Sequence, residues 1–505
     1  MKISIQTHQH GVCPISLMVL LAFIVSLTLA CENRSDDKNI SIVSDDSAAD
    51  NVSDLPDNDL SITENLTDAN FDGYIFNIFG VTQAIGSDWF FVEEETGDVI
   101  DDAVYKRNLL VEDKYGIELS FTLIDNFAEA PKTIQSYIQA GDDTFDLYTA
   151  QQLNLGTLLI SNYFVDWKQV ESIDMTLPCY VQKANETYSI GDKTPLLFGD
   201  FMESNTLRCW NFIFNRNLID EYSLENPYTV VDEGHFTLDY LNTTIRDIAQ
   251  DIDGNTIMDE NDLYGFATDM LATLDAFSRP CGVFAISKDE NNLPVLSFMN
   301  ENTVKAFEKV YDLYFNCPGT YAASENIWHI DNMFAEGKAV FASSRIDLTM
   351  NEKIRAMKDN YGILPYPKLD EEQSDYTTYL SGTFSAQMIG VTQPEADYVR
   401  TGIITQALNA YSHELVIPQI YETTLKTKLT RDENSIRMLD LILANRAYSF
   451  DSCDESAFPL SPICTFRNLL GGKKTKDIAS YYASVEAQAQ AWIDNIINIY
   501  HESND

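Results

Sequence analysis

Short apolar runs alternate with amphipathic runs in the first part of the body of this chain, and this alternation constrains the fold most. Tyr74–Phe79 and Ile117–Ile124 have the length and composition of buried strands, and each is followed by a run with helical spacing. Phe145–Thr149 has the features of a third strand. Strands separated by helices in this way form a parallel sheet with helices on its faces, so we predict an α/β fold. Ligands of such sheets bind at the carboxyl ends of the strands.

Length and charge set two further limits. With 505 residues, the chain exceeds the ~250–300 residues that one hydrophobic core usually serves, so we expect two lobes. Hydrophobic residues make up 45% of the chain, which excludes global disorder. The 78 acidic and 33 basic side chains give a net charge of −45. This charge repels nucleic acids and disfavours electrostatic docking on anionic lipid.

Residues 1–30 resemble the signal peptide of a bacterial lipoprotein. The apolar run from Ile15 to Ala30 is short for a membrane-spanning helix and typical of a signal sequence. Cys31 follows Ala30 as in a lipobox, although Thr28 occupies the position where leucine is usual. We expect Cys31 to be diacylated and to become the first residue of the mature chain, since two acyl chains give stable anchoring. Ordinary signal cleavage after Ala30 is the alternative.

The segment that follows Cys31 has the composition of a disordered tether. Residues 32–70 contain no aromatic side chain and are rich in acidic and polar residues. Such a segment cannot bury enough apolar surface to fold, and its like charges extend it. We therefore predict that residues 31–70 hold the body at the outer face of the cytoplasmic membrane, with the lipid as the only membrane contact.

Six cysteines follow Cys31, and none of them forms a CxxC pair, which argues against a zinc site. Disulfides are permitted outside the cytoplasm. Cys453 and Cys464 are the best candidates for a disulfide by spacing, and six buried free thiols are the alternative.

Several motifs, taken in order over nearly all of residues 71–500, resemble those of one family. They include Asp102-Ala103-Val104-Tyr105, Ala140-Gly141-Asp142-Asp143, Phe214-Asn215-Arg216, Met333-Phe334-Ala335-Glu336-Gly337, Tyr361-Gly362-Ile363-Leu364-Pro365 and Arg431-Asp432-Glu433-Asn434-Ser435. Together they resemble the extracellular family 1, sugar-type solute-binding lipoproteins of bacterial ABC importers. One departure concerns the ligand surface, because Cys179-Tyr180 stands where many relatives have a pair of tryptophans.

The resemblance implies a periplasmic-binding-protein-like fold, with two α/β lobes joined by a multi-strand hinge. It assigns residues 71–202 and 344–414 to one lobe, and residues 203–343 and 415–505 to the other. We expect the chain to cross between the lobes near residues 198–205 and 339–344.

The resemblance also implies a function. It indicates a receptor that binds a mono- or oligosaccharide in an inter-lobe cleft, closes about the hinge and is recognised by the permease subunits of an ABC importer. We expect a monomer without catalytic activity or a required cofactor, and the HExxH, GxSxG and P-loop motifs are absent from the sequence. Two alternatives stay open: a surface-anchored glycan-active enzyme, and a binding protein for a peptide or a cationic solute.

Binding a sugar requires aromatic planes for the ring face and planar polar groups for its hydroxyls. We expect these contacts from side chains at strand ends, on adjacent loops and at the crossings, where the implied fold places the cleft. The predicted ligand residues are Trp89, Tyr148, Gln151, Tyr180, Asn205, Asp269, Trp328, Ser343, Ser344, Arg345, Tyr379 and Thr383.

An acidic segment in the second lobe has the spacing of a calcium-binding loop. Oxygen ligands at positions 1, 3, 5, 9 and 12 and a carbonyl at position 7 are the pattern by which an EF-hand-like loop surrounds Ca²⁺. The sequence departs from it in having Thr256 at position 6, and an aspartate at position 12. We predict a structural Ca²⁺ site, and an acidic turn that caps the next helix is the alternative. The predicted ligands are Asp251, Asp253, Asn255, Ile257, Asp259 and Asp262.

Overall fold

The computed structural model describes residues 61–82, 90–324, 328–349, 351–426, 433–455 and 457–502. The predicted signal peptide, Cys31 and most of the predicted tether lie outside these residues. Within them, no helix has both the length and the apolar character needed to cross a membrane.

The predicted C-terminal end of the tether is wrong, because residues 61–70 pack against the body. Thr63–Asn65 form the 3₁₀ helix η1, and Leu66 is buried. The hydroxyl groups of Ser61 and Thr63 donate to the carboxylate of Glu414 at 3.0 and 2.6 Å. Composition alone could not reveal this attachment, since its acceptor lies more than 300 residues further along the chain.

The first sheet confirms the predicted alternation of strands and helices. Its order is β13-β3-β1-β2, in which the first three strands of the sequence are parallel and β13 is antiparallel to β3. The helix α1 begins after Asp98, whose carboxylate accepts the N–H of Ile100, and ends at Gly116 with φ of 59°. The elements are β1 (Tyr74–Val81), α1 (Val99–Tyr115), β2 (Ile117–Ile124), α2 (Ala130–Gln139), β3 (Leu147–Gln151) and β13 (Ser385–Met388).

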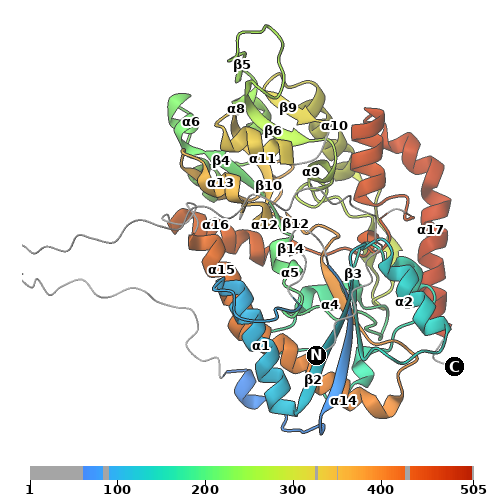
Figure 1. Ribbon diagram of the computed structural model, residues 1–505. Coiled ribbons are helices and arrows are strands. Elements are labelled where there is room, and N and C mark those ends of the chain that lie inside the picture. Colours follow the sequence, from blue (N-terminus) through green and yellow to red (C-terminus); the bar gives the residue numbers. More distant parts are fainter. Residues whose placement is uncertain are drawn as a thin grey trace, which may run out of the picture. The chain divides into compact units, whose positions relative to one another are not determined.

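A second sheet has six strands in the order β11-β4-β10-β6-β5, with β9 paired to β6. Its strands are β4 (Trp210–Asn215), β5 (Ala249–Gln250), β6 (Leu263–Asp269), β9 (Thr320–Ala323), β10 (Ala339–Arg345) and β11 (Tyr361–Leu364). Two small pairs stand apart from it, formed by β7 (Ile286–Lys288) with β8 (Pro294–Leu296), and by β12 (Thr378–Tyr379) with β14 (Arg446–Ala447). The prediction of two α/β lobes is therefore confirmed, and we call the first sheet with its helices lobe 1 and the second sheet with its helices lobe 2 (Figure 1).

Short helices and turns make up much of the remaining chain. Those between β3 and β10 are α3 (Gly156–Leu159), η2 (Trp167–Gln169), α4 (Gln182–Tyr188), α5 (Ser204–Leu207), α6 (Arg216–Glu221), α7 (Pro227–Asp232), α8 (Leu238–Ile245), α9 (Ala272–Asp275), α10 (Glu301–Phe315) and α11 (Trp328–Ala335). After β10 come α12 (Ile346–Thr349), α13 (Glu352–Ala356), η3 (Glu395–Asp397), α14 (Tyr398–Tyr411), α15 (Ile417–Lys426), α16 (Glu433–Ala444), η6 (Phe450–Ser452) and α17 (Ile478–Glu502). Two further segments, η4 (Ser412–Val416) and η7 (Ile463–Gly472), are π-helical.

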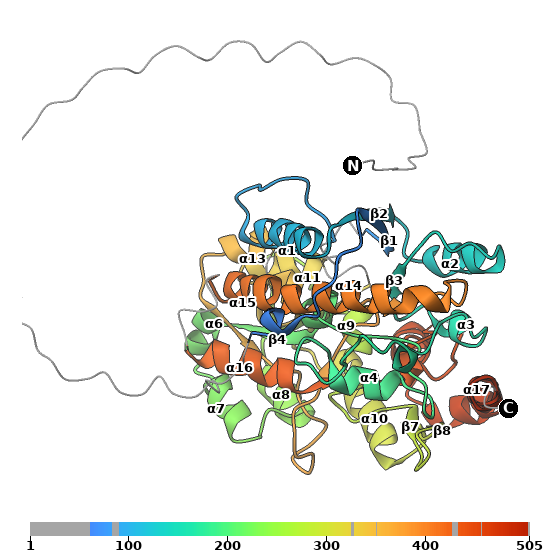
Figure 2. The same cartoon turned by 90° about the horizontal axis from the view of Figure 1, so that it is seen from below.

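The predicted lobe boundaries are wrong in three places. β10 lies between β4 and β6 inside the second sheet, so residues 339–344 do not cross between the lobes. β11 pairs with β4, which assigns residues 361–364 to lobe 2 rather than lobe 1. In the other direction, η4 and α15 pack against α1 of lobe 1, as Figure 2 shows from below. Strand pairing and helix packing, which join distant segments, decided these boundaries.

Three segments connect the lobes and lie side by side. Cys209, which follows α5, forms a bridge with Leu380, and β12 pairs in parallel with β14. The guanidinium group of Arg446 donates to the carbonyl oxygen of Asn205 at 2.8 Å and so joins the first and third segments. The prediction of a multi-strand hinge is thus supported, with its segments near residues 204–209, 378–381 and 446–447.

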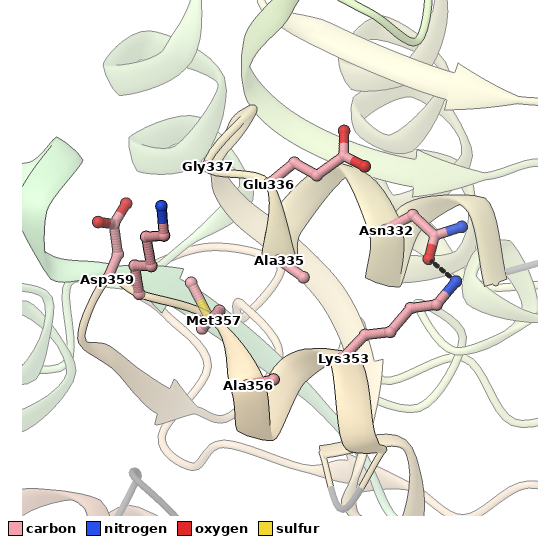
Figure 3. A pocket seen from close by; sticks show the side chains of 9 residues that line it. Asn332, Ala335, Glu336, Gly337, Lys353, Ala356, Met357 and Asp359 are labelled. Atoms are coloured by element: carbon pink, nitrogen blue, oxygen red, sulfur yellow. Dashed lines mark hydrogen bonds between the residues drawn. The ribbon is translucent and has the colours of Figure 1, made fainter.

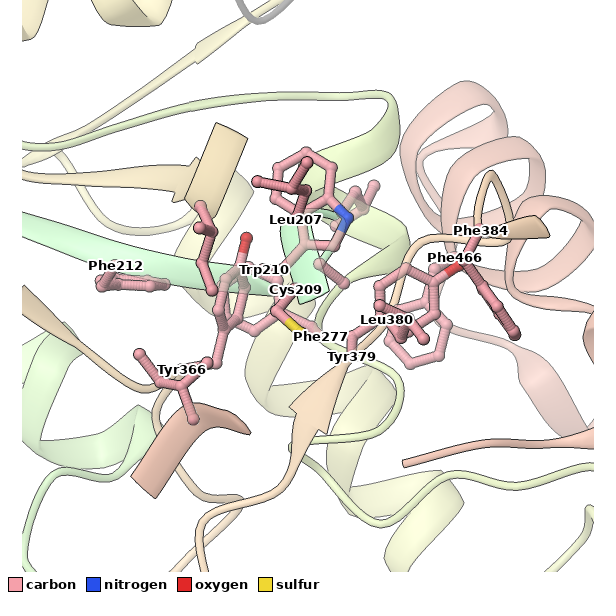
Figure 4. Close-up of a cluster of buried hydrophobic side chains, with 14 of the residues drawn as sticks. Leu207, Cys209, Trp210, Phe212, Phe277, Tyr366, Tyr379, Leu380, Phe384 and Phe466 are labelled. Carbon is pink, nitrogen blue, oxygen red and sulfur yellow. The ribbon is translucent and has the colours of Figure 1, made fainter. Parts of the chain in front are cut away.

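Aromatic side chains fill the interior where these segments enter lobe 2 (Figure 4). Phe212 of β4 makes an edge-to-face contact with Tyr366, with ring centroids 4.7 Å apart, and stacks on Phe266 at 5.0 Å. Such pairs stabilise a core beyond the area that they bury. The lobe 2 end of the hinge is therefore held by dense packing.

All six cysteines after Cys31 are free thiols in this structure, so the predicted Cys453–Cys464 disulfide is not formed. Cys453 is buried, and Cys464 lies beside the carbonyl oxygen of Glu455 at 3.8 Å. Burial raises the pKa of the Cys464 thiol, which makes it less reactive.

Candidate functional site

The polar ends of both sheets meet at the hinge. Gln151 ends β3, Asp269 ends β6 and Arg345 ends β10. Because β4 is antiparallel to β10, its first residue, Trp210, is paired with Arg345 at this edge. In lobe 1, Ser385 of β13 pairs with Gln151 of β3. The side-chain amide of Asn205 donates to the carbonyl oxygen of Ser385 at 3.4 Å, which places Asn205 at the same end of the sheet. We call this region the junction.

Several buried polar atoms at the junction have no hydrogen-bond partner among the described residues. They are Gln151 Oε1, Asn205 Oδ1, Trp210 Nε1, Asn211 Oδ1 and Ser344 Oγ. All five residues are at least nine-tenths buried. An unsatisfied buried polar group costs about 1–3 kcal/mol, so such a concentration indicates a surface built to receive a polar molecule.

Charged side chains from both lobes lie next to these unpartnered atoms and extend the junction. Arg467 of η7 forms an ion pair with Asp275 at the end of α9, and Arg279 forms one with Asp451 of η6. Burial raises the pKa of Asp275 to about 7, although Arg467 acts in the opposite direction. Burial, with the nearby charge of Asp275, raises the pKa of Glu455 to about 8.

A second group of charges lies beside the end of β10. Arg345 donates to both carboxylate oxygens of Asp347, at 2.6 and 2.8 Å, and lies 5.5 Å from the ring centroid of Trp210. Asp331 of α11 is 1% exposed, and its two carboxylate oxygens have no partner among the described residues. Burial, together with the charge of Asp347, raises the pKa of Asp331 to about 8.

Most of the predicted ligand residues lie at or near the junction, and whether they touch a ligand stays a prediction. Asp269 is engaged locally, since its carboxylate accepts the N–H of Leu271 at 2.7 Å and the hydroxyl of Thr273 at 2.8 Å. Arg345 is engaged with Asp347, as described above. The predicted residues that the structure brings to this region are Gln151, Asn205, Asp269, Ser343, Ser344, Arg345, Tyr379 and Thr383.

Two further predicted ligand residues lie in the core of lobe 1, and whether they contact a ligand stays a prediction. Tyr148 is 1% exposed and packs between Phe79 and Phe145, with ring centroids 5.9 and 5.5 Å away. Tyr180 is buried among apolar side chains of lobe 1, and its backbone forms an antiparallel β-bridge with Gly199.

Two more predictions cannot be placed. Trp89 lies outside the described residues, and Trp328 begins α11 with a side chain that is not described.

The sequence reasoning missed five polar residues of the junction. Trp210 and Asn211 follow the first crossing directly. This crossing lies near residues 204–209, about five residues after its predicted position, and a prediction at the observed position would have included both residues. Asp275, Glu455 and Arg467 carry no local signal, because they meet only through tertiary packing. The missed residues are Trp210, Asn211, Asp275, Glu455 and Arg467.

A surface hollow of about 570 Å³ lies on lobe 2, next to α11 and α13 (Figure 3). Lys353 donates to Asn332 Oδ1 at 2.5 Å across one side of it. Of the predicted site residues whose side chains are described, none lines this hollow. Its lining residues are Asn332, Ala335, Glu336, Gly337, Lys353, Ala356, Met357, Lys358 and Asp359.

The acidic loop brings three of the six predicted Ca²⁺ ligands together. Carboxylate oxygens of Asp251, Asp253 and Asp262 lie within 4.8 Å of one another. Asp251 accepts the N–H groups of Gly254 and Thr256 at 2.7 and 2.8 Å, which lowers its pKa. Thr256 adopts φ of 65°, the conformation for which position 6 of such loops usually has glycine. These backbone bonds also hold the loop as an acidic turn, so Ca²⁺ binding stays a prediction.

We expect Ca²⁺ at about 1 mM, where extracellular calcium modules bind, to raise the melting temperature of chelator-treated protein. Asp251→Asn should abolish this shift, because it removes the charge of the first ligand position. Asp220→Asn, at a distant helix, is the control and should keep the shift. Differential scanning fluorimetry and calorimetric titration provide the measurements, and the absence of both heat and shift would contradict the prediction.

No protein-family model matches the sequence, and no curated protein matches it either. Solved structures do match. The galacto-N-biose/lacto-N-biose I-binding protein of an ABC transporter from Bifidobacterium longum, in complex with lacto-N-biose, has 10% identity and a TM-score of 0.56, over 84% of this chain and 99% of that chain. An ABC transporter solute-binding protein from Thermotoga lettingae, bound with α-D-tagatose, has 14% identity and a TM-score of 0.52, over 84% and 100%.

A third match shows that the fold is shared by receptors for different solutes. UgpB from Mycobacterium tuberculosis, in complex with glycerophosphocholine, has 12% identity and a TM-score of 0.52, over 84% of this chain and 99% of that chain. At these identities the likeness concerns the fold. The chain has the two-lobed fold of the solute-binding proteins of ABC transporters, as its motifs suggested.

Proposed function

We propose that this protein is the extracellular solute-binding receptor of an ABC importer and that it binds a mono- or oligosaccharide between its lobes. The observation that carries the proposal is the junction, where buried polar atoms of both lobes lack partners in the described part of the chain, beside a three-segment hinge. The likeness in fold to solute-binding proteins over 84% of the chain supports it.

The chemistry of the junction suits a polyhydroxylated solute. Trp210 offers an indole N–H, Gln151 and Asn211 offer amide oxygens, and Ser344 offers a hydroxyl group. Sugar hydroxyls donate and accept at once, so they can satisfy acceptors and donors on both lobes. A solute that contacts both lobes favours the closed form by its differential affinity, and hinge closure follows from this preference.

The remaining parts of the proposal concern place and partners. We propose that Cys31 carries the lipid, that the segment before Ser61 tethers the body to the outer face of the membrane, and that the closed form is recognised by permease subunits. The lipobox-like sequence and the acidic composition of the tether support this arrangement. We propose a monomeric receptor without catalytic activity.

The test is a panel of neutral, N-acetylated and free-amine oligosaccharides together with short peptides, examined by calorimetry and by mass spectrometry of the probes. Saturable binding of an oligosaccharide without product is the expected result. A micromolar dissociation constant corresponds to about −8 kcal/mol, which calorimetry measures well. Cleaved products would instead identify a glycan-active enzyme, and a response to peptides alone would overturn the sugar assignment.

A further inference from the structure

Carboxylates outnumber their cationic partners at one side of the junction. Arg279 is matched by Asp451, and Arg467 is matched by Asp275. Glu455 has no ion-pair partner among the described residues, and its Oε1 has no hydrogen-bond partner there. Glu455 is 5% exposed. A buried carboxylate without a partner is costly, so this one calls for an explanation.

Glu455 and Asp275 reach this place from the two lobes. The backbone N–H of Glu455 donates to the carbonyl oxygen of Leu153 in lobe 1 at 3.2 Å, whereas Asp275 ends α9 in lobe 2. Gly382 faces the carboxylate of Glu455, and a methyl group at this position would collide with Oε1. The glycine therefore leaves room for the carboxylate. The carbonyl oxygen of Glu455 lies 3.8 Å from the thiol of Cys464 in η7, the segment whose Arg467 pairs with Asp275. The charge of Asp275 accordingly helps to raise the pKa of Glu455.

Asp275 has a free acceptor as well. Its Oδ2 accepts from Arg467, while its Oδ1 is buried without a partner among the described residues. When both acids are ionised, these two acceptors from opposite lobes carry one negative charge more than the arginines among the described residues balance. A sugar hydroxyl could satisfy either acceptor, but only a cation also balances the charge.

We infer that the solute carries a protonated amine, which binds between Glu455 and Asp275 when the lobes close. The inference rests on the proposed function and names the chemical class of its solute as an amine-bearing sugar. The Nε–H of Arg467, also buried without a partner in the described part of the chain, is a donor for a hydroxyl group of the same solute. The net charge of −45 favours the approach of such a cation.

Binding of an ammonium group at this place should release protons from Glu455 and Asp275, and calorimetry can detect this release. Burial raises the pKa values of Glu455 and Asp275 to about 8 and 7, so both are largely protonated at pH 6.0 in the free protein. An ammonium group binds their ionised forms, so binding must release protons, and the observed heat should depend on the ionisation enthalpy of the buffer. The charged or titratable groups that interact with the two acids include Arg467, Arg279, Asp451, Asp269, Cys464, Tyr314, Tyr366 and Tyr379.

The probes are the chitosan disaccharide, which has two free amines, and N,N′-diacetylchitobiose, in which both amines are blocked. We expect wild-type protein to bind the diamine at least ten times more tightly at pH 6.0, with proton release. Glu455→Gln should lose at least tenfold in affinity for the diamine and change its affinity for the diacetyl form less than twofold. Glu486→Gln, on the exposed face of α17, is the matched control and should bind as the wild type does.

Glu455→Gln keeps the shape of the protonated acid, so its melting temperature at pH 6.0 should equal that of the wild type. If this variant fails to fold, Asp275→Asn tests the same charge from the other lobe. Binding of the diacetyl form or of maltotriose as tightly as the diamine would overturn the amine inference and leave the sugar receptor standing. Binding of trilysine but no oligosaccharide would support the amine and overturn the sugar, and no binding of any probe would overturn both.

Discussion

Replacing Arg279 with methionine is expected to lower the free energy of unfolding by about 3–5 kcal/mol, because it leaves Asp451 as a buried charge without its partner. Arg279 is 2% exposed and donates to both oxygens of Asp451, to the carbonyl oxygen of Val283 at 2.7 Å and to Ser452. The pair joins the segment that follows β14 to the segment that follows α9. Urea unfolding monitored by tryptophan fluorescence measures the loss.

Arg437→Met provides the control, since Arg437 and Asp232 form an ion pair whose side chains are 45% and 44% exposed. Exposed pairs contribute about 0–1 kcal/mol, so this variant should stay close to the wild type. The double variant Arg279→Met/Asp451→Leu should recover most of the stability, because it removes both charges together. Equal stability of Arg279→Met and Arg437→Met would show that the buried pair is not needed.

Stability should fall as the pH rises from about 5 to above 8. Burial raises the pKa of Asp275 to about 7 and the pKa values of Asp331 and Glu455 to about 8. In the unfolded chain these groups return to ordinary values near 4. Between the two sets of values the folded protein binds more protons than the unfolded chain, so their contribution is complete below about pH 4 and is lost as the pH rises through 7 and 8.

The loss should reach several kcal/mol, since each pKa unit corresponds to about 1.4 kcal/mol. Denaturant unfolding at pH 5.5, 7.0 and 8.5 measures it. Asp331→Asn cannot ionise and should flatten the decline, whereas Asp494→Asn on the exposed face of α17 should leave it unchanged. A free energy of unfolding that is constant or rises over this range would contradict the assignment. Glu414, whose pKa is lowered by its bonds to Ser61 and Thr63, titrates below this window.

Local sequence patterns predicted the three parallel strands of the first sheet and the outline of the junction. The strands at residues 74–81, 117–124 and 147–151 lie close to their predicted ranges, because apolar runs of this length bury both faces of a parallel strand. The C-terminal helix α17 likewise follows its local pattern, since Ala489, Ile493 and Ile496 recur at helical spacing and are buried. The junction was predicted in outline through Gln151, Asn205 and Ser344.

The errors arose where pairing partners are far apart in the sequence. β11 reads as a strand in isolation, but only its pairing with β4, about 150 residues earlier, assigns it to lobe 2. Tyr148 and Gln151 belong to one short strand, and only tertiary packing shows that the first lies among Phe79 and Phe145 while the second keeps an oxygen without a partner in the described part of the chain. Composition likewise placed residues 61–70 in the tether, whereas Glu414 holds Ser61 and Thr63 to the body.

The sequence by itself thus determined the α/β class, because periodicity within short segments reveals strands and helices, and the length of the chain indicated two lobes. The anchor at Cys31 and Ca²⁺ binding by the acidic loop stay predictions. Tertiary structure alone decided where the chain crosses between the lobes and which charges meet there. Glu455 and Asp275 are 180 residues apart, and no local sequence pattern around either residue predicts that the two lie close together. Their proximity results from three hinge segments that fold the C-terminal part of the chain back against both sheets.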